Sequence, residues 1–163
     1  MCIRDRDTYN SGIHFLGFEY PYYIVKKIIR SSLSDLICKG VKPKYYFLSG
    51  GGNKQTFTKK NLSLISKSLK EEQKKYSIIV GGGDTVYSKI PSFSVTTIGF
   101  AKKIIERNKA KKDDDIYVTG NIGDSFIGLK IMQNKYFMEN KLKKYFIKIY
   151  RMSLLTKKLS SML

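Results

Sequence analysis

The stretch Ile78-Ile79-Val80-Gly81-Gly82-Gly83-Asp84-Thr85 constrains the fold of this chain more than any other. Its short β-branched run predicts a buried strand. The three glycines allow the backbone to turn sharply and to approach a bulky ligand closely. Asp84 then stands at the strand exit, where a carboxylate can bind a hard cation such as Mg²⁺ through oxygen. The stretch predicts either a nucleotide and metal site or an ordinary β-turn with a solvated aspartate, and both interpretations stay open here.

Working outward from this strand, apolar spacing of three and four residues predicts helices, and alternation predicts strands. The first helix opens at Pro21 and ends before Gly40 and Pro43, which suit a helix C-terminus. We expect helices at 21–38, 59–76 and 124–133, strands at 12–16, 45–48, 78–80, 92–100 and 115–119, a glycine-rich loop at 49–54, and poorly defined helical structure over 134–163.

Strands alternate with helices, which predicts an α/β (α+β) fold with a mixed sheet flanked by helices. The charged segment 102–115 predicts a linker, so we expect an N-terminal domain at 7–108 and the start of a second α/β domain at 109–163. Residues 1–6 lack periodicity and the lysine-rich style of the rest. We interpret them as non-native read-through, and we expect the chain to be an interior fragment of a longer protein.

Composition limits the classes of partner. The 163 residues carry a formal net charge of +18, from 31 Lys and Arg against 13 Asp and Glu. The excess is mostly lysine scattered among other residues, and arginine, the usual base reader, is scarce, which argues against nucleic-acid binding, while an anionic small substrate also suits the charge. Cys2 and Cys38 form no metal motif or disulfide framework, which indicates a cytoplasmic protein. No apolar stretch approaches the roughly 20 residues that span a membrane.

Several acidic residues stand where they could carry chemistry. Asp7 precedes the first predicted strand, Asp84 follows the glycines, and Asp124 opens a helix after two glycines. Asp35 lies among leucines near a helix C-terminus, where the helix dipole and burial both disfavour its charge unless a cation is near. Periodicity alone slightly favours a solvated Asp35 just outside the apolar stripe.

Two further residues have an ordinary and a functional interpretation. His14, the only histidine, is either a packing residue or a hydrogen-bond donor to an anionic substrate. Arg107 is either a surface charge or a ligand at the domain junction, where clefts often form. The segment 49–54 lacks the P-loop spacing, and the chain has no Rossmann Gly-x-Gly-x-x-Gly after a strand.

Taken in order, these motifs resemble the thiamine-monophosphate kinase (ThiL) family of the PurM/AIR-synthetase-like superfamily. The resemblance extends over about residues 7–132, and the order and spacing of the motifs carry it. The motifs are Asp7 before Gly12-Ile13-His14-Phe15, Leu33-Ser34-Asp35-Leu36 with Gly40 and Pro43, Gly82-Gly83-Asp84-Thr85, Arg107 with Ala110-Lys111, Ile116-Tyr117-Val118-Thr119-Gly120, Gly123-Asp124-Ser125 and Gly128-Leu129.

The resemblance implies a PurM-like N-terminal domain that transfers the ATP γ-phosphoryl group to thiamine monophosphate, giving thiamine diphosphate. It implies Mg²⁺ ligands at Asp7, Asp35 and Asp84, ATP contacts at Gly83, Asp84 and Arg107, and substrate binding by His14. It assigns no covalent or acid–base residue, because metal ions and cations screen two anions while positioning does most of the work. It also implies a homodimer formed through the N-terminal domain.

The chain departs from the family pattern at several positions. Ser11 replaces a common glutamate, and Lys109 and Lys112 replace glycine and proline. The family's Asp-Asp-Ala-Ala strand and later Ser-Asp-Gly-Leu motif are missing, so we expect the chain alone to be inactive. The alternatives are another ATP-using enzyme of the superfamily, such as selenophosphate or aminoimidazole ribonucleotide synthetase, a non-catalytic dimerisation domain, or a basic nucleic-acid-binding module.

Overall fold

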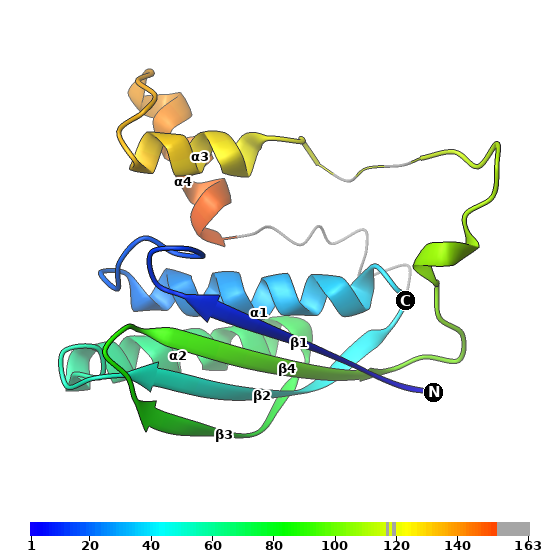
Figure 1. The fold of residues 1–163 in the computed structure, drawn as a ribbon, viewed down its shortest axis with the longest axis horizontal. Helices are drawn as coiled ribbons and strands as arrows, with labels where there is room; N and C mark the ends of the chain where they lie inside the picture. The colour runs from blue at the N-terminus through cyan, green and yellow to red at the C-terminus, as the bar shows by residue number, and fades with distance from the viewer. Residues whose placement is uncertain (117, 119, 153–163) are drawn as a thin grey trace.

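The computed structural model describes residues 1–116, 118 and 120–152, shown in Figure 1. The elements follow in the order β1 (Cys2–Asn10), α1 (Pro21–Ile37), β2 (Lys42–Gly52), α2 (Lys59–Tyr76), β3 (Ile79–Tyr87), β4 (Ser92–Phe100), the short 3₁₀ helix η1 (Arg107–Lys109), α3 (Asp124–Met132) and α4 (Asn140–Met152). None of the helices in the described residues combines the length and the hydrophobicity of a membrane-spanning segment.

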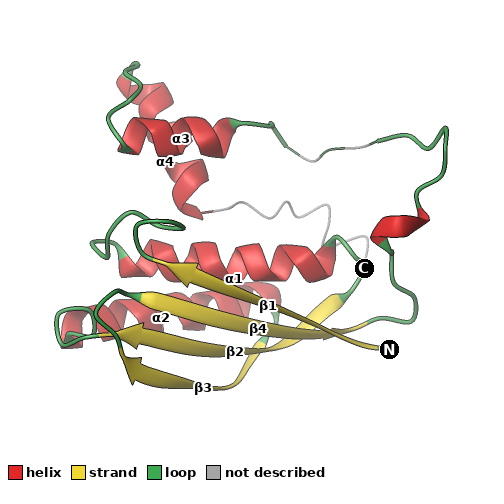
Figure 2. Ribbon diagram, viewed as in Figure 1, coloured by secondary structure: helices red, strands yellow, loops and turns green. Residues whose placement is uncertain are grey.

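The four strands form one mixed sheet in the order β1-β4-β2-β3 (Figure 2). β4 pairs antiparallel with both β1 and β2, whereas β2 and β3 are parallel and are joined by the α2 crossover. A parallel pair needs such a crossover, because a hairpin can join only antiparallel strands. The predicted α/β class, a mixed sheet flanked by helices, is confirmed.

α1 lies across one face of the sheet, and α3 and α4 lie on the far side of α1 (Figure 1). The buried side chains of α1 recur at the spacing that the sequence predicted, and they pack with inward-facing residues of β1, β2 and β4. On β4 the inward residues alternate strictly, as expected for a strand with one face on the core. The core comprises Tyr9, Phe15, Ile24, Val25, Ile28, Ile29, Leu33, Ile37, Tyr46, Ile65, Ile78, Phe93 and Val95.

The glycine run is not a turn, so that prediction is wrong. β3 continues through Gly81, Gly82 and Gly83, and a register shift opposite Tyr46 and Phe47 absorbs one extra residue. Gly82 has a φ of 149°, which L side chains rarely adopt, and a Cβ on Gly83 would collide with the backbone carbonyl of Leu48. The glycines therefore serve strand pairing beside β2, and Asp84 lies inside the strand.

Other element boundaries also differ from prediction. Residues 49–52 belong to β2 and do not form a loop. Residues 12–16 form a turn with one isolated bridge, and the first strand is β1, at 2–10. The helices predicted at 21–38, 59–76 and 124–133 and the strand at 92–100 are confirmed. The strand predicted at 115–119 includes residues 117 and 119, which lie outside the described residues. The helical structure predicted over 134–163 is described as far as residue 152, and α4 lies within that part.

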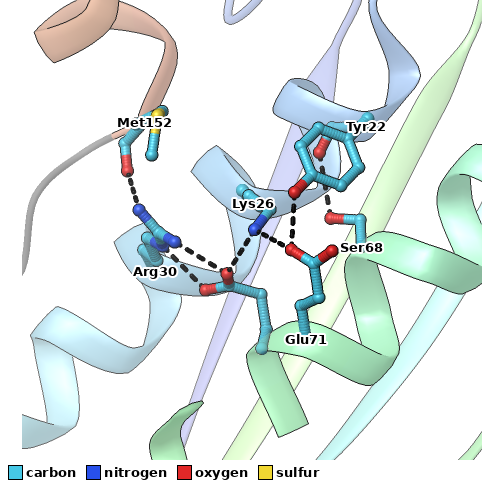
Figure 3. Close-up of polar contacts among 7 residues, drawn as sticks. Tyr22, Lys26, Arg30, Ser68, Glu71 and Met152 are labelled. Carbon is cyan, nitrogen blue, oxygen red and sulfur yellow. Dashed lines mark hydrogen bonds and ion pairs between the residues drawn. The ribbon is translucent and has the colours of Figure 1, made fainter. Parts of the chain in front are cut away.

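A buried polar network joins α1, α2 and α4 (Figure 3). The Arg30 guanidinium donates to both carboxylate oxygens of Glu72 at 2.7 Å and to the backbone carbonyl of Met152 at 2.8 Å. Lys26 Nζ donates to Glu71 Oε2 at 2.6 Å, and Tyr22 donates to the same oxygen. Hydrogen bonds from Lys26 and Tyr22 lower the pKa of Glu71. Bidentate, charge-assisted pairs of this kind fix orientation as well as adding energy.

We expect Arg30→Met to lower the free energy of unfolding by about 3 kcal/mol, because it leaves the buried Glu72 carboxylate without its bidentate partner. Arg30→Met with Glu72→Met should recover most of that loss, since the buried carboxylate is removed together with its bidentate partner and Lys26, 3.4 Å from Glu72, still pairs with Glu71 at 2.6 Å. Urea denaturation of the full-length protein measures both, with the exposed Lys70→Met on α2 as the control. Equal destabilisation by the single and double variants would show that charge pairing is not the source of the effect.

Candidate functional site

Three carboxylates meet between β1 and α1. Asp5 and Asp7 are two residues apart on β1, so both side chains point to the face that α1 covers. Asp35 comes from the C-terminal half of α1. One carboxylate oxygen from each of the three lies within 4.8 Å of the others, and all three residues are half-buried. This carboxylate cluster gathers three acidic side chains within a strongly basic chain.

The described contacts of Asp5 leave one of its carboxylate oxygens without a partner. Lys39 Nζ lies 3.7 Å from Asp5 Oδ1. The other oxygen, Asp5 Oδ2, is buried and has no hydrogen-bond partner among the described residues. Like charges at this separation repel, and a buried carboxylate oxygen without a partner carries a desolvation cost. Carboxylate oxygens are the ligands that Mg²⁺ prefers, so the donor set fits a divalent cation.

Tyr9 links the carboxylate cluster to His14. Its hydroxyl donates to Asp7 Oδ2 at 3.1 Å, and its ring meets the His14 ring edge-on, with 5.7 Å between centroids. Burial, and secondarily the charges of Asp7 and Asp35, raise the pKa of Tyr9, so its hydroxyl stays protonated and remains a donor. One side chain therefore contacts both a predicted metal ligand, Asp7, and the predicted substrate residue, His14.

His14 is exposed, in the turn that follows β1. Its Nδ1 accepts a hydrogen bond from the Asn10 backbone N–H at 3.0 Å. A neutral imidazole that accepts at Nδ1 carries its proton on Nε2. His14 can therefore present an N–H donor to an anion.

Asp84 does not join the carboxylate cluster. It lies on β3, in the register row of Ser49, Ser94 and Thr8, so three strand spacings, about 14 Å, separate it from β1. Its Oδ1 accepts from the Thr85 backbone N–H at 2.7 Å. Gly83 precedes it in the same strand. Any cation bound by Asp84 within one chain would be distinct from one bound by Asp7.

Arg107 begins η1, in the irregular segment between β4 and α3. Its backbone is described, but its side chain lies outside the described part of the chain, so its predicted contact with ATP stays a prediction. The division into domains at 108 and 109 and the non-native origin of residues 1–6 likewise stay predictions. In the structure, residues 2–6 form the first half of β1 and pair with β4.

Sequence reasoning missed Asp5, because it set residues 1–6 apart from the fold. The signal was present in the spacing, since Asp5-Arg6-Asp7 places two carboxylates on one face of any strand. The preference for a solvated Asp35 also missed the proximity of β1. Asp35 does leave the apolar stripe, but that side of the helix faces β1 and its carboxylates.

The fold and site define a family. The AIR synthase related protein N-terminal domain family matches residues 3–101, and the chain belongs to this family. Within it, the chain resembles the thiamine-monophosphate kinases. It is 36% identical over 148 residues to the enzyme of Buchnera aphidicola subsp. Schizaphis graminum, a match that covers 87% of this chain and 44% of that relative. The chain thus spans less than half the length of this relative.

Two solved structures share the fold. The thiamine monophosphate kinase from Aquifex aeolicus superposes with a TM-score of 0.89 at 22% identity, covering 98% of this chain and 55% of that one. AaThiL complexed with AMPPCP and TMP superposes with a TM-score of 0.88 at 23% identity, covering 99% and 51%. These likenesses confirm the predicted PurM-like architecture.

We expect Asp35→Asn to raise the melting temperature of the full-length protein in EDTA, because it removes one of three mutually repelling charges. Mg²⁺ at about ten times its Kd should stabilise the unaltered protein by about 1.4 kcal/mol, and Asp35→Asn should lose most of that gain. Thermal unfolding with and without Mg²⁺ measures both effects. The exposed Asp115→Asn is the control, and an undiminished Mg²⁺ response in Asp35→Asn would contradict a cation site at the carboxylate cluster.

Proposed function

We propose that the protein containing this chain is a Mg²⁺-dependent kinase that transfers the γ-phosphoryl group of ATP to the phosphate of thiamine monophosphate, giving thiamine diphosphate. The observation that carries this proposal is the link through Tyr9 between the carboxylate cluster and His14. It supports a proposed cation site next to a proposed hydrogen-bond donor for an anionic acceptor. The thiamine-monophosphate kinases among the relatives, and the AaThiL complex with AMPPCP and TMP, support the choice of substrates.

The proposed roles follow from the donor chemistry. Asp7 and Asp35, with Asp5 beside them, would hold one Mg²⁺ site, and Asp84 would hold another with the nucleotide. Bound Mg²⁺ would neutralise phosphate charge and orient the reacting groups. His14 Nε2–H would donate to the phosphate of thiamine monophosphate, while Gly83 and Arg107 would contact ATP. Phosphoryl transfer of this kind proceeds by positioning and charge stabilisation, so no side chain of this chain is assigned as nucleophile or general base.

Purified full-length protein with Mg²⁺-ATP and thiamine monophosphate should form thiamine diphosphate. We expect His14→Ala to raise the KM for thiamine monophosphate about 10- to 100-fold, because a hydrogen bond to a charged group is lost, and to leave the KM for ATP little changed. Steady-state kinetics measure both constants. Ile13→Ala, an exposed neighbour in the same turn, is the control.

Absence of thiamine diphosphate formation by the full-length protein would contradict the proposed function. ATP turnover with selenide or with formylglycinamidine ribonucleotide as co-substrate would then favour the selenophosphate or aminoimidazole ribonucleotide synthetase alternative.

The outer face of the sheet supports the homodimer. The face opposite α1 exposes large apolar side chains at Tyr45 and Phe47 of β2, Ile79 of β3 and Phe100 of β4. All nine residues of β3 are exposed, and an uncovered edge strand invites pairing with another chain. Contiguous exposed apolar surface of this kind marks an interaction site. We assign it to a second copy of the chain.

We expect Phe47→Asp to convert the dimer to a monomer, because the introduced carboxylate would be desolvated at the centre of the apolar face. Analytical ultracentrifugation of the full-length protein measures the mass. Ile116→Asp replaces an apolar side chain that is 93% exposed and away from the sheet, and it should leave the dimer intact. A monomeric unaltered protein, or a dimeric Phe47→Asp, would contradict the assignment.

Compartment and other partners follow from the same observations. Both cysteines, Cys2 and Cys38, are free and exposed, which suits the reducing cytoplasm. We therefore propose a cytoplasmic enzyme. The scattered lysines are better suited to anionic substrates than to sequence-specific nucleic-acid recognition.

A further inference from the structure

The turn that carries His14 packs on α1 through Phe15 and is hydrogen-bonded to α1 through Lys27. Within the turn, the His14 backbone N–H donates to the Asn10 carbonyl at 2.9 Å, and the Gly12 N–H donates to the Phe15 carbonyl at 2.8 Å. From α1, Lys27 Nζ donates to the His14 backbone carbonyl at 3.0 Å. This bond fixes the backbone from which the imidazole projects.

The Lys27 ammonium is held in place by α4. It lies over the Tyr150 ring, 3.7 Å from the centroid, which is a close cation–π contact. Lys27 lines a small cavity together with Phe15, Leu16, Ile24 and Met132, and Arg151 lines the same cavity. Burial lowers the pKa of Lys27 to about 8, so at neutral pH the amine is still mostly protonated. In such surroundings the His14 carbonyl and the Tyr150 ring act on the charge more strongly than they would in water.

The residue next to Tyr150 contacts the other end of the same loop. The Arg151 guanidinium lies 4.2 Å from the centroid of the Tyr20 ring and 5.9 Å from that of Tyr23. Tyr20 closes the loop and immediately precedes α1. Consecutive residues of α4 therefore contact the His14 loop at its C-terminal end and, through Lys27, at His14 itself.

We propose that Lys27 is a positioning residue for His14, and that Tyr150 acts through it to couple the α3–α4 unit to the substrate-binding turn. The inference rests on the proposed role of His14 in binding the phosphate of thiamine monophosphate. Packing of α4 on α1 sets the ammonium position, the ammonium fixes the His14 carbonyl, and the imidazole then meets the acceptor at a defined angle. The ATP side of the site, at β3, lies outside this chain of contacts.

This arrangement makes a different prediction from a purely structural lysine. If Lys27 had only a structural role, its loss would lower the stability of the protein and change the KM for thiamine monophosphate no more than the KM for ATP. A positioning role weakens the binding of thiamine monophosphate alone, because only His14 is displaced.

In the full-length protein we expect Lys27→Met, which keeps the apolar stem, to raise the KM for thiamine monophosphate about tenfold. The KM for ATP should stay within about twofold of the unaltered value. Lys27→Arg keeps both the donor and the charge and should restore much of the loss. Lys130→Met is the matched control, because Lys130 also lies over a ring, that of Phe126 at 4.9 Å, and no hydrogen bond described in the structure joins its side chain to residues 11–20.

Variants of Tyr150 test the coupling to α4. Tyr150→Leu removes the aromatic face and should raise the KM for thiamine monophosphate in the same direction as Lys27→Met, whereas Tyr150→Phe keeps the ring and should lie closer to the unaltered protein. An increase in Lys27→Met but none in Tyr150→Leu would overturn the coupling to α4. Unchanged KM values in a folded Lys27→Met would overturn the positioning role.

Hydrogen exchange separates this inference from the proposed function. Amide exchange over residues 11–16 should be faster in Lys27→Met and in Tyr150→Leu than in the unaltered protein, because the first variant removes the hydrogen bond to the His14 carbonyl and the second removes the ring that positions Lys27. If the unaltered protein does not phosphorylate thiamine monophosphate, the proposed function fails. The exchange measurement still tests whether Lys27 holds the turn that carries His14. Unchanged exchange in both variants would show that it does not, and should Lys27→Met not fold, Tyr150→Leu and Lys27→Arg carry the test.

Discussion

Repulsion among three carboxylates is the constraint around which this site is built. The packing of α1 on the sheet places Asp35 against β1, and the period of the strand places Asp5 and Asp7 on the same face. Lys39 lies 3.7 Å from Asp5, the Tyr9 hydroxyl donates to Asp7, and Asp5 Oδ2 has no hydrogen-bond partner among the described residues. A divalent cation would reduce the repulsion among the carboxylates and give Asp5 Oδ2 a partner, which is why the proposed chemistry is centred on Mg²⁺.

The remaining contacts hold α1 in the orientation that this cluster requires. On one side the apolar stripe packs on the sheet, and on another Arg30 binds Glu72 of α2 and the Met152 carbonyl at the end of α4. Replacing a buried ion pair with apolar residues is often tolerated, so the pair is better understood as setting geometry than as a large source of stability. Lys27, three residues earlier on α1, extends the same arrangement to the turn that carries His14.

Much of this could be predicted from periodicity and motif order. The helices 21–38 and 59–76 and the strand 92–100 were predictable because their apolar residues follow one period throughout. The glycine run does not form the predicted turn, because its glycines are required by tertiary packing. Gly83 must pass close to the Leu48 carbonyl of the neighbouring strand, which local sequence does not reveal. Asp7 and Asp35 were identified through the family resemblance, but their meeting with Asp5 depends on how α1 docks on β1. The contacts of Lys27 with His14 and Tyr150 join three separate segments, and no local pattern encodes them.

Anomalous scattering from crystals of the full-length protein grown with Mn²⁺ and a non-hydrolysable ATP analogue tests the cation site most directly. Mn²⁺ takes the oxygen ligands that suit Mg²⁺. We expect an anomalous peak about 2.0–2.5 Å from carboxylate oxygens of Asp7 and Asp35, with Asp5 in contact directly or through water. An anomalous map with no peak at this cluster would contradict the site, whether or not peaks occur elsewhere. A refined structure in which Lys39 contacts the carboxylates and no metal ion is present would contradict it too.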